Sequence, residues 1–304
     1  MEYVLETKRL AKSYRGFSAL QSLDMKIPKG AIYGFVGRNG AGKTTLIRLI
    51  CGLQKPSGGG YTLYGIRNDD KKIDRARRRI GAVVETPSLF PDMTAEENLR
   101  IQHMLIGLPS DGGIDELLRL VGLSGTGRKK VREFSLGMRQ RLGIAVALAG
   151  NPDLLILDEP VNGLDPQGII EMRELILELN RERGITVLIS SHILDELSRL
   201  ATCYGFIDRG HMLREMTAEE ISTRCRKCVH IEVSDTKALA RVLDGMDVEY
   251  SITGDSAADI YAELPVTRLV NELSREGCAV ISMKECDESL ESFYMNLVGG
   301  DRNA

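Results

Sequence analysis

The sequence lacks tryptophan altogether, and aromatic residues make up only 5% of its 304 residues. It also lacks any apolar run near the roughly 20 residues that a membrane-spanning helix needs. Its longest apolar runs, such as 144–149, have the length of a core segment. Neither sign of charge dominates, because 40 Lys and Arg residues stand against 43 Asp and Glu residues and leave a net charge of -3. A general nucleic-acid binder is more basic than this, so we expect no nucleic acid among the partners.

Export signals and a cysteine framework are lacking too. Residues 1–4 have neither the basic start nor the apolar stretch of a signal peptide, and six scattered cysteines suit reduced thiols. We therefore expect a cytosolic protein. Cys225 and Cys228 form one CxxC pair, but no second pair with matching spacing completes a zinc site, and the histidines are dispersed. Free thiols are the favoured interpretation, and the role of this pair stays open.

The length favours one large domain followed by a small one. In the first part, short apolar strands alternate with helical segments, which is typical of an α/β fold with a mainly parallel sheet covered on both faces. We interpret 56–60 as a loop, 71–79 as a basic helix with a solvated face, and 93 to about 150 as helical with breaks. The predicted strands of the sheet are 32–36, 80–84, 154–157, 186–190 and 204–208.

The residue pattern of the sequence changes near 217–227. We therefore place a domain boundary there, between domains 1–222 and 223–304. Beyond it the predicted order is strand, helix, strand, strand, helix, strand, which suggests a small α+β domain of the ferredoxin-like kind. A last helix is predicted at 289–298. No catalytic cluster is visible in this domain, and the sequence does not choose between dimer support and regulation as its role.

A phosphate-binding loop is the clearest motif. Residues 37–44 match G-x-x-x-x-G-K-[ST], between the apolar strand 32–36 and an apolar helix from 46 to about 53. The glycines let the backbone curl, so that its N–H groups and the following helix N-terminus point at phosphate oxygens. Lys43 supplies a cation for the β- and γ-phosphates, and Thr44 a hydroxyl for Mg²⁺. The role of Arg38 is open, and the loop alone does not separate an ATPase from a GTPase or a kinase.

Two acids follow the buried strand 154–157. Ligands of parallel sheets bind at the carboxyl ends of the strands, where Asp158 and Glu159 stand. Asp158 can hold the Mg²⁺ shell, and Glu159 can accept a proton from an attacking water. The long separation of these acids from Lys43 leaves room for an inserted helical subdomain, more than a simple kinase needs.

From about residue 2 to about 221, the chain resembles the nucleotide-binding subunit of an ABC transporter, with the motifs in the family's order. The resemblance implies an ATPase with a P-loop NTPase fold that uses ATP and Mg²⁺. It implies that Tyr14 stacks on adenine, that Glu159 is the general base and that His192 lies near the γ-phosphate. Nucleotide is expected to be held by Tyr14, Gly37, Asn39, Gly40, Ala41, Gly42, Lys43, Thr44, Thr45, Ser135 and Gly137, and the metal by Thr44, Glu85 and Asp158.

The segment Ser135-Leu136-Gly137-Met138 resembles the family's signature loop, which caps the ATP of the opposite subunit. The segment 162–165 resembles the loop that couples the two sites. The resemblance therefore implies a second nucleotide-binding subunit, either identical or a sibling, with ATP held between the two. Two departures stand out: Leu136 and Met138 occupy the usual Gly and Gln places of the signature, and Glu85 replaces a common Gln. Its carboxylate is expected to keep the coupling role, by binding Mg²⁺ or orienting water.

A narrower resemblance, to bacterial exporters for self-protection against lantibiotics and bacitracin-like peptides, rests on residues 85–87, 90–91, 94, 97–99 and 134–141. It implies a separate membrane permease as partner, contacted through 85–99, and a location on the inner face of the cell membrane. Related drug exporters are its nearest competitor. A soluble ABC ATPase of DNA repair or translation is the alternative, although such proteins typically carry a second nucleotide domain, long coiled coils or basic extensions. A small-molecule kinase would lack the signature loop and the histidine.

Overall fold

The structure is a computed structural model, which describes residues 1–304 except 1, 110–111, 225–227, 263–264, 287–289 and 301–304. The chain divides into two compact units, Met1–Ala218 and Glu219–Ala304. The expected boundary at 222/223 falls inside α8 (Ala218–Arg224), a few residues after this division. No helix in the described ranges is both long and apolar enough to cross a membrane.

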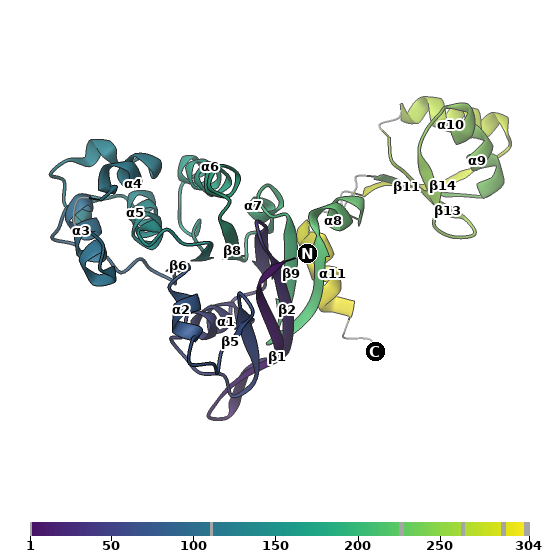
Figure 1. The fold of residues 1–304 in the computed structure, drawn as a ribbon. Coiled ribbons are helices and arrows are strands. Elements are labelled where there is room, and N and C mark those ends of the chain that lie inside the picture. The colour runs from purple at the N-terminus through teal and green to yellow at the C-terminus, as the bar shows by residue number, and fades with distance from the viewer. Residues whose placement is uncertain (1, 110–111, 225–227, 263–264, 287–289, 301–304) are drawn as a thin grey trace. The chain divides into compact units, whose positions relative to one another are not determined.

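A six-stranded sheet forms the centre of the first unit (Figure 1). Five of its strands are parallel and β10 is antiparallel, so the predicted mainly parallel sheet is confirmed. All residues of β3, β7 and β8 are buried, which explains why these strands appear in the sequence as short apolar runs. In spatial order the strands are β10 (His211–Thr217), β9 (Cys203–Asp208), β3 (Ile32–Val36), β8 (Thr186–Ser191), β7 (Leu154–Asp158) and β6 (Ile80–Val83).

A second sheet covers part of the first, and it contains the strands that the sequence predicts near the start of the chain. It is antiparallel, in the order β2 (Phe17–Pro28), β1 (Tyr3–Tyr14), β4 (Gly58–Leu63) and β5 (Ile66–Arg67). Its apolar side chains share one core with α1 (Lys43–Ile50), α2 (Ile73–Arg77) and with Leu154, Ile156 and Leu188 of the parallel sheet. The helix that follows the phosphate loop, α1, therefore packs against side chains of both sheets.

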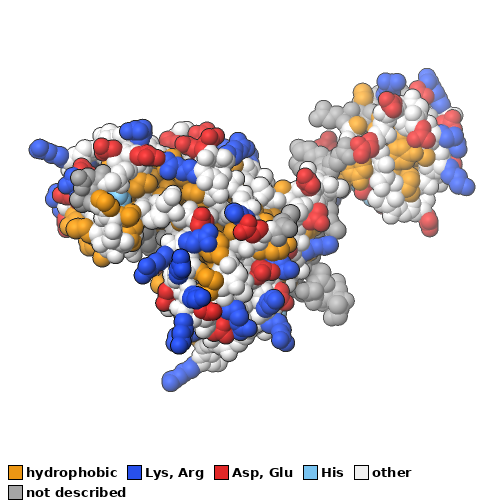
Figure 2. All heavy atoms as spheres, viewed as in Figure 1, with side chains coloured by type: hydrophobic (Ala, Val, Ile, Leu, Met, Phe, Trp, Pro, Cys, Tyr) orange, Lys and Arg blue, Asp and Glu red, His pale blue; other side chains and the backbone are white. Residues whose placement is uncertain are grey.

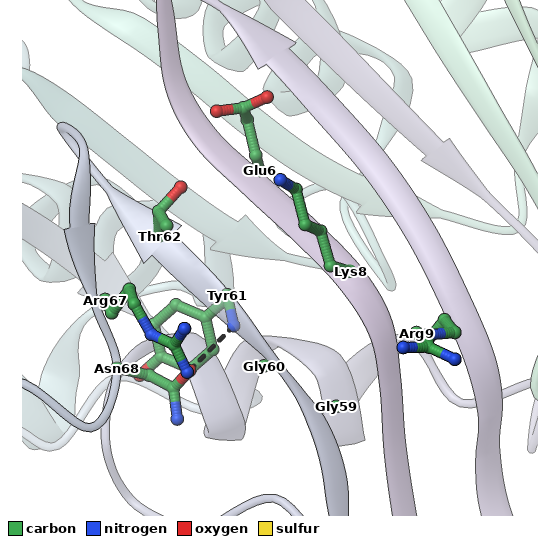
Figure 3. Close-up of a pocket in the computed structure, with 9 residues that line it drawn as sticks. All are labelled: Glu6, Lys8, Arg9, Gly59, Gly60, Tyr61, Thr62, Arg67 and Asn68. Carbon is green, nitrogen blue, oxygen red and sulfur yellow. Dashed lines mark hydrogen bonds between the residues drawn. The ribbon is translucent and has the colours of Figure 1, made fainter.

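The interpretation of 56–60 as a loop holds for 56–57 and is wrong for 58–60, because Gly58–Leu63 is β4. A Cβ on Gly59, whose φ is +60°, would lie 1.9 Å from the carbonyl oxygen of Arg9. The glycine is there because β1 approaches too closely for a side chain. Gly59 and Gly60 also line a hollow of about 340 Å³ on the sheet. There Tyr61 N donates to Asn68 Oδ1 at 2.8 Å (Figure 3). No residue predicted for the nucleotide site lines it.

A cluster of helices is inserted between β6 and β7, as predicted for 93–150. It holds α3 (Ala95–Ile106), α4 (Ile114–Leu120) and α5 (Leu136–Leu148), with α6 (Pro166–Arg183) beside it (Figure 1). Short 3-10 turns at Ser124–Thr126 and Val131–Glu133 separate α4 from α5. Thr94 and Glu97 form a capping box that starts α3, and Gly107 ends it in the left-handed conformation. The last short helix of this unit is α7 (Leu194–Ser198).

The second unit has the predicted succession of elements after α8. Its antiparallel sheet has the order β12-β13-β11-β14, and α9 and α10 supply the leucines of its core. The ferredoxin-like interpretation rests on this arrangement. Cys228 lies in β11, whereas Cys225 lies outside the described residues. The elements are β11 (Cys228–Val233), α9 (Thr236–Gly245), β12 (Tyr250–Ile252), β13 (Ala257–Ile260), α10 (Val266–Arg275), β14 (Val280–Cys286) and α11 (Leu290–Gly300).

Replacing Gly59 by Ala tests the close approach of β1 and β4. We expect Gly59→Ala to lower the free energy of unfolding by at least about 2 kcal/mol, measured by urea denaturation, because the new Cβ collides with backbone at a positive φ. Gly58→Ala is the matched control, since its Cβ would meet only Ala11 Cβ at 3.6 Å. Equal shifts of the two unfolding midpoints would contradict this explanation.

Candidate functional site

The phosphate loop joins the end of β3 to the start of α1, and its glycines are sterically required. A Cβ on Gly37 would lie 2.6 Å from Ile207 Cγ2, and one on Gly42 would lie 2.7 Å from the Ala19 carbonyl oxygen. Gly40 and Gly42 have φ values of +81° and +113°. Only glycine fits this path at low cost. The resulting cradle of backbone at a helix N-terminus suits a phosphate.

Lys43, the first residue of α1, is 6% exposed, and its side chain turns back over the loop. Its Nζ donates to the carbonyl oxygen of Gly37 at 2.6 Å and forms an ion pair with Glu159 Oε1 at 3.1 Å. A nearly buried ammonium therefore stands between the loop and the acid that follows β7. An incoming phosphate would compete with Glu159 for this cation.

Asp158 ends β7 and is held by two hydroxyls. Thr44 Oγ1 donates to its Oδ2 at 2.8 Å, and Ser190 Oγ donates to its Oδ1 at 2.5 Å. Asp158 and Ser190 are direct partners in the parallel register of β7 and β8. Ser190 is not among the residues that the sequence predicts for the site. The signal that could have found it is a hydroxyl residue at the carboxyl end of a strand predicted to lie beside the acidic one.

Glu159 has a φ of +52°, a left-handed backbone that a non-glycine residue rarely adopts. Its N–H donates to the Ser190 carbonyl oxygen at 3.1 Å, and its Oε2 lies 2.8 Å from His192 Nδ1. His192 follows β8 directly. Three strands thus bring Lys43, Asp158, Glu159 and His192 together at one edge of the sheet, as the sequence predicts.

The residues at this edge fit a hard divalent cation such as Mg²⁺, since they offer a hydroxyl and a carboxylate oxygen. Thr44 and Asp158 already contact each other there. Within the part of the chain that the structure describes, no group of three or more His, Cys, Asp or Glu side chains forms a separate metal cluster. Glu85, also predicted to hold the metal, accepts a hydrogen bond at its Oε1 from Arg48 Nη2 at 2.7 Å.

Tyr14, expected to stack on adenine, ends β1 at the hairpin with β2. Its hydroxyl donates to Gln54 Oε1 at 2.5 Å, and Lys12 Nζ lies 5.2 Å from the centroid of its ring. The side chain is 42% exposed. These contacts fix the ring beside the chain that leaves α1, with part of its surface open to a ligand.

Ser135 and Gly137 lie at the start of α5. Ser135 Oγ accepts from Met138 N at 3.2 Å, which caps the helix. This segment adjoins residues 162–165, since a Cβ on Gly163 would lie 3.2 Å from Leu136 Cδ2. Among the described residues, no hydrogen bond joins Ser135 or Gly137 to the phosphate loop, and Figure 1 places α5 apart from α1. The predicted nucleotide residues therefore form two separate groups.

Two partly buried cysteines of the first unit, Cys51 and Cys203, have unreactive thiols. Burial raises the pKa of the Cys51 thiol to about 12 and that of the Cys203 thiol to about 11. Both thiols are therefore protonated at neutral pH, and a protonated thiol is neither a good nucleophile nor a metal ligand. The favoured interpretation of free thiols agrees with this chemistry for these two residues.

Comparison with known proteins gives the same family throughout. The profile of the family described as ABC transporter matches residues 20–162. The bacitracin transport ATP-binding protein BcrA of Bacillus licheniformis is 42% identical over 99% of this chain and 99% of its own. The lantibiotic transport ATP-binding protein SrtF of Streptococcus pyogenes is 42% identical over 70% of this chain and 90% of its own.

Two solved structures resemble the fold. CbiO1 of Clostridium perfringens, part of the ABC transporter complex CbiONQ, matches with a TM-score of 0.66 at 27% identity, over 81% of this chain and 97% of that chain. A dimeric ATP-binding cassette in a post-hydrolysis state bound to ADP and Pi matches with a TM-score of 0.64 at 27% identity, over 70% of this chain and 98% of that chain.

Removing the Ser190 hydroxyl tests the arrangement around Asp158. We expect Ser190→Ala to weaken binding of a Mg²⁺–nucleoside triphosphate about tenfold by calorimetry, because a buried carboxylate loses one of its two donors. Thr186→Val is the matched control, since Thr186 is buried at the opposite end of β8 and bonds Gly30 N instead. If both variants bind equally well, Ser190 has no part in the site.

Proposed function

The chain belongs to the ABC transporter ATP-binding family, and we propose that it powers the export of antimicrobial peptides through a separate membrane permease. As a member of this family it is an ATP-binding and ATP-hydrolysing subunit. The observation that carries the proposal is its 42% identity to a bacitracin transport ATP-binding protein over 99% of both chains, which includes the second unit. A peptide antibiotic of the bacitracin or lantibiotic kind is the cargo class that fits these relatives.

In the proposed mechanism, nucleotide binding frees the general base. The phosphates draw Lys43 away from Glu159, to which it is paired at 3.1 Å. Glu159 then accepts a proton from the attacking water, while His192, 2.8 Å from Oε2, holds the carboxylate in place. Mg²⁺, held by Thr44 and Asp158, would supply positive charge to the phosphate oxygens.

The second group of nucleotide residues implies a second subunit. The N-terminus of α5 presents backbone N–H groups beside Ser135, a combination that binds phosphate, yet it stands apart from the loop before α1. We propose that it completes the ATP site of a partner cassette, either another copy of this chain or a sibling. ATP then stabilises the closed pair, and hydrolysis reopens it.

The segment 85–99 is the proposed permease contact. A hollow of about 150 Å³ lies along this segment and is lined by Thr86, Pro87 and Leu89. On its other side it is lined by Leu136 and Arg139, at the start of α5. Phe90 is 49% exposed, and near the end of α3 Met104 and Leu105 are 63% and 74% exposed. Figure 2 shows hydrophobic side chains gathered over α3, and such a group of exposed apolar side chains marks a surface for a partner. This contact would hold the chain at the inner face of the cell membrane.

A role in DNA repair or translation is not supported. The relatives that cover the whole chain include transport proteins, and the net charge of -3 gives no attraction to nucleic acid.

Replacing the proposed base tests the mechanism. We expect Glu159→Gln to slow ATP hydrolysis on the order of 10²-fold or more while ATP still binds, because the amide cannot take the proton. Light scattering is expected to show ATP-bound dimers of this variant. Glu178→Gln, at an exposed position of α6, is the control and is expected to hydrolyse ATP normally. Normal turnover by Glu159→Gln would remove Glu159 as the base.

The cargo class is tested in cells. Cells that carry this chain with its permease are expected to tolerate a bacitracin-like or lantibiotic peptide better than cells that lack both, measured as growth inhibition across a panel of compounds. The Lys43→Ala variant is expected to give no protection, because the cradle loses its cation. Equal sensitivity with and without the pair, across the whole panel, would contradict the proposal.

A further inference from the structure

Glu85 emerges at the same edge of the sheet as the catalytic acid. Val83 of β6 pairs with Leu157 of β7 in parallel register. Glu85 lies two residues after Val83, and Glu159 lies two residues after Leu157. The two segments therefore leave the sheet side by side. A carboxylate at this place adds negative charge close to where triphosphate would bind.

Arg48 of α1 compensates this charge. Its Nη2 lies 2.7 Å from Glu85 Oε1, and the two side chains are 37% and 56% exposed. Glu85 has a φ of +58°, a conformation that surrounding contacts must maintain in a residue with a Cβ. The ion pair joins the phosphate-loop helix directly to the segment 85–99.

The next residues reach a different helix. A Cβ on Gly143 of α5 would lie 2.6 Å from Pro87 Cβ, so Pro87 packs against the bare backbone of α5. Residues 85–87 therefore contact α1 at one end and α5 at the other. The first helix follows the phosphate loop, and the second begins with the signature segment.

We propose that Arg48 is a positioning residue that neutralises Glu85 and keeps its carboxylate from the Mg²⁺–phosphate group. The pair ties α1 to the segment that reaches α5 and the permease contact. This inference rests on the proposed ATP site. It assigns Glu85 to Arg48 as its partner and leaves the metal to Thr44 and Asp158.

The proposal has a characteristic mutational pattern. Arg48→Gln leaves an uncompensated carboxylate near the phosphates, so it is expected to raise the KM for ATP about two- to fivefold, the range for exposed ion pairs, with little change in kcat. Glu85→Gln removes the charge that needed compensation, so it is expected not to raise the KM for ATP. The double variant is therefore expected to return to the wild-type KM. Arg48→Lys keeps the positive charge and is expected to have a KM close to the wild-type value.

The experiment compares these variants as full chains with the permease. ATP hydrolysis gives KM and kcat, and paramagnetic resonance of Mn²⁺ in the presence of ATP measures metal binding independently of turnover. Mn²⁺ affinity is expected to be unchanged in Glu85→Gln. Arg183→Gln is the control, because Arg183 of α6 forms a similarly exposed pair with Glu116 of α4, outside the segment 85–99, and the variant is expected to leave KM unchanged.

Two results would overturn the inference. One is weaker Mn²⁺ binding in Glu85→Gln, which would make Glu85 a metal ligand. The other is a KM for Arg48→Gln that either equals the wild-type value or stays raised in the double variant, which would leave Arg48 without this role. Absence of ATP hydrolysis in the wild-type complex would instead contradict the proposed function, so the two failures are distinguishable.

Discussion

The parallel register of β3, β8 and β7 is the constraint on which the site depends. Val36 pairs with Ser191, and Ser190 pairs with Asp158, so the three strands end at one level. At that edge the structure brings together side chains that lie far apart in the sequence, namely Lys43, Asp158, Glu159 and His192. Lys43 forms an ion pair with Glu159, and two hydroxyls donate to Asp158. Polar groups that have partners in this way can lie together in a partly buried place. A slip in the register of these strands would separate Lys43 from Glu159, the proposed base.

Motifs whose chemistry is local could be predicted from the sequence. The phosphate loop needs glycine at fixed places in a short segment, and the acids follow a strand that is recognisably buried. Ser190 and Arg48 could not be found in this way, because their roles follow from pairing between distant segments. The strand β4 was missed for a related reason. Gly59 is a signal for a loop until β1 is seen to occupy the space of its side chain.

The separation of the nucleotide residues into two groups gives the fold its proposed use. A phosphate loop with its acids can bind and cleave a triphosphate, but Ser135 and Gly137 belong to another helix at another face. If two cassettes meet, each supplies what the other lacks, and ATP becomes part of the interface. Residues 85–87 contact both α1 and α5, so a closure that moves α5 relative to α1 would act on them. The segment proposed to contact the permease begins at the same place. Binding energy can then be transmitted as a displacement.

Mixing two defective subunits tests this central claim most directly. One carries Lys43→Ala, which removes the cation of its own loop. The other carries Gly137→Asp, where an added Cβ would meet nothing closer than Leu164 Cδ2 at 3.7 Å and the carboxylate adds charge that repels phosphate. Each variant alone is expected to be nearly inactive with the permease. The account predicts that mixing them restores ATP hydrolysis, because the intact loop of one faces the intact signature of the other. A mixture as inactive as its parts would contradict it.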